Sequence, residues 1–127
     1  MERFLLVCLG SALGGGARYL VSGWAAKVFG PSFPYGTLAV NLLGSFLLAA
    51  LMYAGVEASA MPPRLRIALT TGAMGGFTTY STFSYETMRY LHDGAWMTAL
   101  VNVAVTVLGC LVACWLGWAG AQRLLGT

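Results

Sequence analysis

Four long apolar stretches make up nearly the whole chain, with only short polar breaks between them. A helix needs about 20 mostly apolar residues to cross a bilayer, and each stretch is at least that long. Charged residues make up 9% of the 127 residues, against about 25% in an ordinary soluble domain. The sequence therefore predicts an all-α membrane protein, a single domain over residues 1–127 with four transmembrane helices. The expected spans are 3–28, 35–56, 64–91 and 95–123.

The basic residues give only a weak signal for the orientation of these helices. With four spans, both termini and the middle loop share one side, which would hold four arginines: Arg3, Arg64, Arg66 and Arg123. The other side would hold Lys27 and Arg89. Since basic loops favour the cytoplasmic side, so small a difference is compatible with insertion in both orientations and equally with a single one. The basic residues are scattered along the chain, so no nucleic-acid partner is expected.

The segment GGFTTYSTFS, residues 75–84, interrupts the third apolar stretch near its midpoint at Phe77. Gly75 and Gly76 weaken a helix, and the Thr and Ser hydroxyls that follow can take over backbone hydrogen bonds. Together they favour a helix that is broken near the bilayer centre, where freed carbonyls suit a cation and helix N-termini suit an anion. The alternative is a continuous helix whose small residues allow close packing against a neighbour. The residue types alone do not decide between the two.

Three motifs of this chain resemble those of one known family. Residues 14–19 read GGGARY, residues 36–44 read GTLAVNLLG, and residues 75–84 form the segment described above. In their order, and over the whole length of the chain, they resemble the Fluc/CrcB family of bacterial fluoride ion channels. One position departs from the usual family pattern TTFSTF, because Tyr80 stands where the family has its first phenylalanine.

The resemblance implies a function and an assembly. It implies a passive, highly selective fluoride channel in the bacterial cytoplasmic (inner) membrane, which exports fluoride and lowers its cytoplasmic concentration. It implies an antiparallel, dual-topology homodimer with two pores, and a structural Na⁺ at the dimer interface, held by the backbone carbonyls of Gly75 and Thr78. Association is also expected on physical grounds, since four spans cannot readily enclose a polar pathway and still face lipid.

A fluoride pore needs neutral hydrogen-bond donors, because carboxylates repel the ion and because the ion must still be able to leave. Thr37, Asn41 and Ser45 are four residues apart, so they share one helix face. The Asn41 amide carries two N–H donors, and Thr37 adds a hydroxyl on the same face. The alternative is that Asn41 only bonds a neighbouring helix. The match of residues 36–44 to the family motif favours a pore-lining role for Asn41.

Side chains that follow the expected break are the other pore candidates. Tyr80 and Phe83 share a face if the helix resumes there, and the positive edge of an aromatic ring can meet an anion. Alternatively, both rings only pack in a subunit interface. The resemblance favours the first role, because the family uses these two positions as its pore aromatics. The hydroxyls of Ser81 and Thr82 lie beside them in the sequence.

Two charged residues lie well inside the expected spans. Arg18 is about four turns into the first span, where a charge must reach water or a partner. It is expected to line a wet vestibule that concentrates anions; the alternatives are snorkelling to the interface or pairing with Glu86. The alternative function is a small dual-topology proton-coupled exporter. Such exporters depend on a glutamate inside the first helix, and this chain has none there after Glu2.

Other functional classes find little support in the sequence. There is no Ser-His-Asp set, and GGGAR lacks the Lys-Ser/Thr pair of a phosphate-binding loop, so no enzyme is expected. A membrane scaffold would explain the glycines but not the polar residues of the second and third spans. Cys8, Cys110 and Cys114 all lie in apolar runs; Cys110 and Cys114 are expected to be ordinary buried thiols, without the partners of a metal site. Asn102 and Thr106 form a second polar pair, which either lines the pathway or packs against a helix.

Overall fold

The computed structural model describes residues 1–126, and every regular element in that range is a helix. Three long helices are α1 (Glu2–Phe29), α2 (Tyr35–Met52) and α6 (Trp96–Leu125). A π-helical turn, η1 (Tyr53–Glu57), extends α2. The third apolar stretch is divided among α3 (Pro63–Ile67), the π-helical η2 (Ala68–Met74), α4 (Gly75–Phe77) and α5 (Tyr80–His92).

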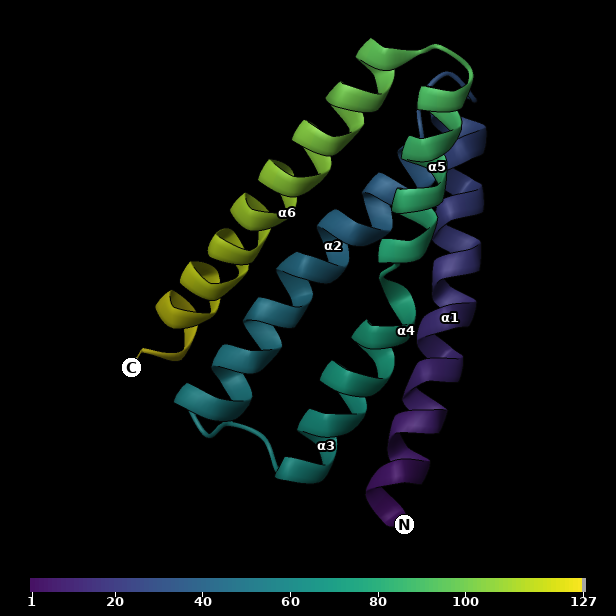
Figure 1. The fold of residues 1–127 in the computed structure, drawn as a ribbon. Helices are drawn as coiled ribbons and strands as arrows, with labels where there is room; N and C mark the ends of the chain where they lie inside the picture. The colour runs from purple at the N-terminus through teal and green to yellow at the C-terminus, as the bar shows by residue number, and fades with distance from the viewer. Residues whose placement is uncertain (127) are drawn as a thin grey trace.

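The chain runs back and forth between two ends of the molecule (Figure 1). The N-terminus and the loop between α2 and α3 lie at one end, and the loop after α1 and the turn between α5 and α6 lie at the other. At the first end, Arg64 Nη1 lies 3.0 Å from Glu2 Oε1, which joins the start of α3 to the start of α1. α1, α2 with η1, and α6 are each long and apolar enough to cross a membrane. The chain is a multi-pass membrane protein.

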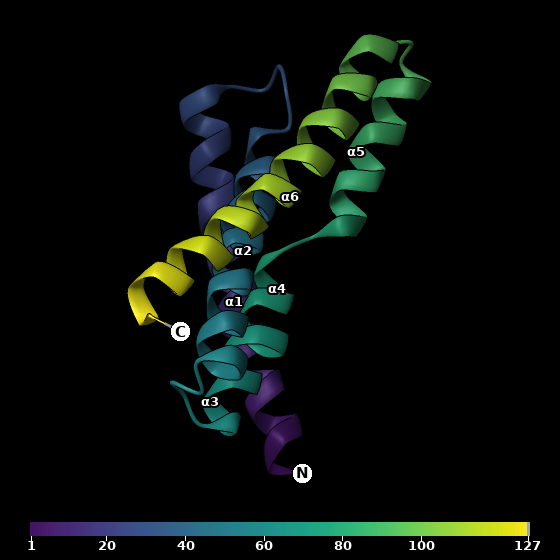
Figure 2. The same ribbon diagram turned by 90° about the vertical axis from the view of Figure 1, so that its left-hand side faces the viewer.

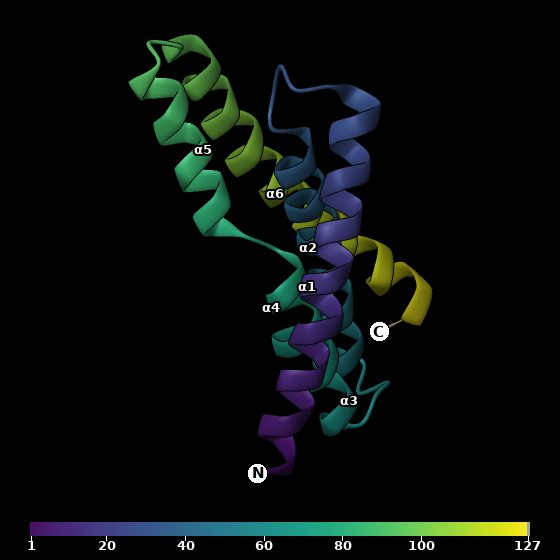
Figure 3. The same cartoon turned by 90° about the vertical axis from the view of Figure 1, so that its right-hand side faces the viewer.

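The helix α2 lies between α1 and α6, and it carries contacts with both (Figures 2 and 3). Close approach of α6 depends on Gly117, where an added Cβ would collide with the carbonyl oxygen of Phe46. On the other side, a Cβ on Gly36 would lie 2.6 Å from the carbonyl oxygen of Ser22 in α1. Small residues allow such backbone approach in membranes, where lipid offers helices no hydrophobic gain for associating.

A close contact also joins α1 to the first half of the third span. Gly14 is buried, and a Cβ at this position would collide with the carbonyl oxygen of Ala73 in η2. On the facing element, a Cβ on Gly76 would collide with the carbonyl oxygen of Ser11. The Ser11 hydroxyl donates to the Gly72 carbonyl oxygen at 3.3 Å. Gly76, one of the two glycines that weaken the helix, therefore also sets the distance between α1 and the third span.

The third span is broken, so the alternative of a continuous helix is wrong. α4 ends at Phe77, and two residues take extended backbone angles: Thr78 with φ −84° and ψ 159°, and Thr79 with φ −150° and ψ 105°. The break therefore begins one residue after the predicted midpoint. Beyond it, α5 diverges from α1 and packs against the first part of α6 (Figure 3). This divergence opens space between α1, α2 and α5.

The close contact at Gly14 generates a test of the fold. Gly14→Ala should destabilise the protein by about 1–3 kcal/mol, because the added methyl group overpacks the contact between α1 and η2. Gly120→Ala is the matched control, since nothing lies within 4 Å of a Cβ at that position. Thermal unfolding in mild detergent should show a lower midpoint for the first variant only. Equal midpoints for the native chain and Gly14→Ala would contradict the contact.

Candidate functional site

The side-chain amide of Asn41 holds the break in the third span from the side of α2. Thr79 N–H donates to Asn41 Oδ1 at 2.8 Å, and Asn41 Nδ2 donates to the Thr79 carbonyl oxygen at 3.1 Å. Both residues are buried. A backbone N–H and C=O that leave a helix inside a membrane need such partners, because no water is at hand to replace them. We call this pair of hydrogen bonds the Asn41–Thr79 clamp.

The Thr79 side chain starts the new helix. Its Oγ1 accepts from Thr82 N–H at 3.2 Å, as an N-cap residue does, and it donates to Thr82 Oγ1 at 2.9 Å. The Ser81 hydroxyl lies 3.4 Å from the same Oγ1. Since a helix N-terminus carries a partial positive charge, these contacts place a cluster of hydroxyls at the positive end of α5.

The break also frees two carbonyl oxygens that the sequence analysis singled out. The Gly75 carbonyl would pair with Thr79 N–H in a continuous helix, but that N–H donates to Asn41. The Thr78 carbonyl would pair with Thr82 N–H, but that N–H donates to Thr79 Oγ1. Oxygen ligands of this kind suit hard cations. Gly75 is exposed on the surface of the single chain and Thr78 is half-buried.

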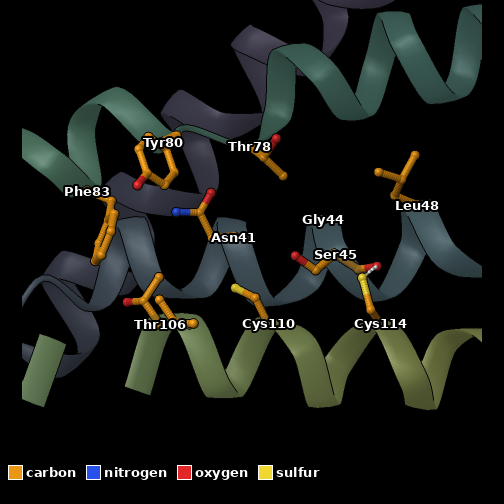
Figure 4. Close-up of a pocket in the computed structure, with 11 residues that line it drawn as sticks. Asn41, Gly44, Ser45, Leu48, Thr78, Tyr80, Phe83, Thr106, Cys110 and Cys114 are labelled. Carbon is orange, nitrogen blue, oxygen red and sulfur yellow. Dashed lines mark hydrogen bonds between the residues drawn. The ribbon is translucent and has the colours of Figure 1, made fainter. Parts of the chain in front are cut away.

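On one side of the clamp lies a cavity of about 290 Å³, which we call the groove (Figure 4). It is lined by residues from α2, from the break and α5, and from α6: Asn41, Gly44, Ser45, Leu48, Thr78, Tyr80, Phe83, Thr106, Val107, Cys110 and Cys114. None of these eleven residues is acidic. Its polar groups are neutral, and they include the Asn41 amide and the hydroxyls of Ser45 and Tyr80. The groove therefore offers hydrogen bonds to an anion without a carboxylate that would repel it.

Two aromatic rings stand at the Asn41 end of the groove. The ring centroids of Tyr80 and Phe83 are 5.6 Å apart, with the planes 62° to one another in an edge-type contact. Phe83 is 6% exposed, whereas Tyr80 is 79% exposed in the single chain. The edge of an aromatic ring is its positive part, so this arrangement can present ring edges to a bound anion. A partner that covers Tyr80 would close the groove.

On the other side of the clamp lies a second cavity, of about 340 Å³, which we call the Arg18 cavity. Arg18 and Ser22 of α1 line it, together with residues from α2, the break and α5: Thr37, Val40, Thr79 and Thr82. Arg18 is half-buried, so its guanidinium makes this space electropositive. The clamp joins Asn41, which lines the groove, to Thr79, which lines the Arg18 cavity.

Glu86 does not pair with Arg18. The Thr37 hydroxyl donates to Glu86 Oε1. Within residues 1–126, the ion pair closer than 4.0 Å is Arg64–Glu2, so the pairing of Arg18 with Glu86 considered above is not found. The hydroxyl of Thr37 thus holds the acid that lies well inside a span. This contact leaves the Arg18 charge to act on the cavity itself.

The structure divides the polar face of α2 that the sequence analysis treated as one stripe. Asn41 and Ser45 line the groove, whereas Thr37 lines the Arg18 cavity. Tyr80 and Phe83 come together in the groove, and Thr82 and Arg18 come together in the other cavity. Ser81 is exposed and lines neither of these two cavities.

A chain of hydrogen bonds joins α6 to α5 at the end of the groove. Thr106 Oγ1 donates to Asn102 Oδ1 at 3.3 Å, and Asn102 Nδ2 donates to Thr87 Oγ1 at 3.0 Å. The Thr87 hydroxyl donates in turn to the Phe83 carbonyl oxygen at 2.8 Å. Asn102 thus packs against a neighbouring helix, while Thr106 also lines the groove. Of the two roles considered for this pair, Asn102 has the packing role, and Thr106 lies on the wall of the groove.

Sequence reasoning missed several residues of the site. It overlooked Thr79, since nothing in its residue type indicates that its backbone bonds Asn41. It also expected Cys110 and Cys114 to be ordinary buried thiols, whereas both are only half-buried and line the groove. Cys8 is exposed on α1. The spacing of four residues from Asn102 through Thr106 to both cysteines was the signal that they share one face of α6.

A broken helix inside a bundle of apolar helices, beside a groove with polar donors, defines a small membrane protein with a polar site in its interior. Comparison with known proteins identifies its family. The family described as "CrcB-like protein, Camphor Resistance (CrcB)" matches residues 5–118. The chain belongs to this family.

Curated relatives match almost the full length of the chain. A protein of Anaeromyxobacter sp. (strain K), named "Fluoride-specific ion channel FluC", is 58% identical over 113 residues, which cover 89% of this chain and 90% of the relative. Proteins with the same name from Citrifermentans bemidjiense and Sorangium cellulosum are 52% and 48% identical over 124 and 125 residues. Both alignments cover 98% of this chain, with 100% and 98% of the relatives.

The clamp can be tested apart from any transport measurement. Asn41→Leu leaves Thr79 N–H and C=O without their partners, at a cost of about 1–3 kcal/mol or more for each group. Amide exchange over residues 78–83 should therefore accelerate by at least about 30-fold, as measured by mass spectrometry of that peptide in mild detergent. Peptides from α6 serve as the internal control. Unchanged exchange at residues 78–83 would show that Asn41 does not hold the break.

Proposed function

We propose that this protein is a passive fluoride channel. The observation that carries the proposal is the groove, where the Asn41 amide, hydroxyls and two aromatic rings meet beside a broken helix without an acidic residue. The names of the curated relatives supply the ion. Fluoride is small and strongly hydrated, so a pathway must replace its water with donors that do not hold it too tightly. Neutral amide and hydroxyl groups and ring edges meet that condition.

Each candidate residue takes a role from its place in the structure. Arg18 concentrates anions in its cavity, where the hydroxyls of Thr37 and Thr82 also lie. The clamp uses one of the two N–H donors of Asn41, which leaves the second for the ion. Tyr80 and Phe83 present ring edges in the groove beyond the clamp. Ser81, at the exposed start of α5, serves the same pathway from the face that a partner would cover.

The alternative, a proton-coupled exporter, is not favoured. Such a mechanism needs an acid that is free to take up and release a proton at the ion site. Glu86 is held by Thr37, and none of the residues that line the groove is acidic. The relatives are named as channels, which also sets this family apart from enzymes. Passive conduction needs no titrating group, and the site resembles a passive one.

The functional unit is an antiparallel homodimer of chains inserted in both orientations, with two pores. In the single chain the groove is open and Tyr80 is 79% exposed, so a second copy is needed to close the pathway away from lipid. Gly75 and Thr78 would hold a structural Na⁺ by their carbonyl oxygens. Two oxygens from one chain fall short of the roughly six or more that hard cations such as Ca²⁺ take, and a second chain doubles their number. The assembly belongs in the bacterial cytoplasmic (inner) membrane.

Fluoride efflux from liposomes tests the proposed function directly. Purified protein should release trapped fluoride, read by a fluoride electrode, and should release negligible chloride. Efflux should require a potassium ionophore, because passive movement of an anion builds up a voltage that stops it. Phe83→Ile should slow efflux by removing a ring edge from the groove. Fluoride efflux that follows a proton gradient and needs no ionophore would overturn passive conduction.

If the native protein releases no fluoride from liposomes, one further variant should be measured. Tyr80→Phe introduces the residue of the usual family pattern TTFSTF and removes a hydroxyl from the groove. Efflux from this variant alone would show that the Tyr80 hydroxyl holds the ion or a water molecule too long. Absence of efflux from both proteins would contradict the fluoride function.

The assembly and the cation can be examined together. Light scattering in mild detergent should give particles of two chains. Their thermal unfolding midpoint should rise when Na⁺ replaces choline at equal ionic strength, because an ion that binds only the folded protein stabilises it. Particles of one chain with intact efflux would refute the dimer. An unfolding midpoint that is the same in both salts would refute the sodium site.

A further inference from the structure

Two thiols line the same wall of the groove. Cys110 and Cys114 are one helical step of four residues apart on α6, and both are half-buried groove residues. Their sulfur atoms extend from α6 toward α2 (Figure 4). Cys114 Sγ donates to the Ser45 carbonyl oxygen at 3.3 Å, which orients this thiol into the space between the two helices. Neither thiol has a role in the conduction of fluoride proposed above.

The spacing of the two thiols does not suit a disulfide. Residues four apart on a helix have Cβ atoms about 5–6 Å apart, whereas a disulfide needs Cβ atoms about 3.5–4.5 Å apart. A metal ion between the sulfurs fits better, since two metal–thiolate bonds of roughly 2.3 Å each span about 4.6 Å. The same helix therefore disfavours oxidation of the pair and favours its bridging by one ion.

A metal ion that binds both thiols must be soft and must bind stably with only two protein ligands. Thiolates select soft metals. Among residues 1–126, no group of three or more His, Cys, Asp or Glu side chains could hold a metal ion, so a tetrahedral site of the zinc type is not available. A d¹⁰ ion that binds two sulfurs in a line, such as Hg²⁺, meets both conditions. With Hg²⁺ the product is neutral, which suits a site inside a membrane.

We infer that Cys110 and Cys114 form a binding site for a soft, two-coordinate metal ion, and that a bound ion closes the groove to fluoride. On binding Hg²⁺, two S–H bonds break, two S–Hg bonds form and two protons pass to water. No electron is transferred. The bridged ion would lie along the groove wall that α6 forms, which also includes Thr106. The block of transport rests on the proposed function; the binding of the metal does not.

Binding is measured first, without any transport. In a Cys8→Ser background, one equivalent of mercuric chloride per chain should protect both remaining thiols from a maleimide reagent. The intact protein should gain the mass of one mercury less two hydrogens. Cys110→Ala and Cys114→Ala, each in the same background, keep a single S–Hg bond. These single-thiol variants should release the metal at a glutathione concentration at least tenfold lower than the Cys8→Ser protein, which keeps both thiols.

Transport is measured second, on the same proteins in liposomes. Micromolar mercuric chloride should slow fluoride efflux at least tenfold in the Cys8→Ser background, relative to the rate of that protein before addition. The double variant Cys110→Ala/Cys114→Ala should keep its own rate within twofold. Dithiothreitol should reverse the block by removing the metal. Native protein and Cys8→Ser should respond alike, since Cys8 lies on the exposed surface of α1.

The outcomes separate the two proposals. Protection of only one thiol, or equal release by pair and single variants, would overturn the metal site. Protection of both thiols with unchanged fluoride efflux would overturn the block while leaving the site. Metal binding by a protein that conducts no fluoride at all, as native chain or as Tyr80→Phe, would count against the proposed function alone.

Discussion

Two hydrogen bonds between the Asn41 amide and the Thr79 backbone stabilise the helix break on which the rest of this structure depends. Without them, a broken helix would leave an N–H and a C=O unpaired inside a membrane, where each costs several kcal/mol. With them, the third span can change direction, α5 can diverge from α1, and space opens on both sides of the break. The polar group that satisfies the backbone is thus the same group that stands between the two cavities.

The charges around the break are distributed to favour an anion. Arg18 adds positive charge to one cavity, and the hydroxyls around Thr79 lie at the positive N-terminus of α5. The acid nearest to them, Glu86, is held by a hydroxyl. The groove beyond offers an amide and ring edges that attract an ion weakly. Weak attraction of an anion in the groove and the fixed charge of Arg18 in its cavity are compatible with entry of the anion followed by its release.

The sequence predicted what depends on composition and spacing, and it missed what depends on packing. The helical class followed from long apolar stretches, whereas two glycines before a run of hydroxyls indicated a broken helix without excluding a continuous one. The partner of Asn41 could not be predicted, because Thr79 contributes its backbone and any residue type has one. The division of Thr37 from Ser45 between two cavities also escaped prediction, since it follows from the path of α5 after the break. The thiols on α6 were visible as a spacing but were read as ordinary core residues.

The pairing of distant segments has a consequence for how the protein is made. The Ser11 hydroxyl bonds the carbonyl of Gly72, 61 residues later in the chain, and α2 packs along α6, which leaves the ribosome after the other helices described here. α1 must therefore enter the membrane before the part of the third span that it contacts has been synthesised. Its long apolar sequence allows this, because a spanning helix satisfies its own backbone before it packs. Assembly of the bundle is then a late event, complete only after α6 has been synthesised.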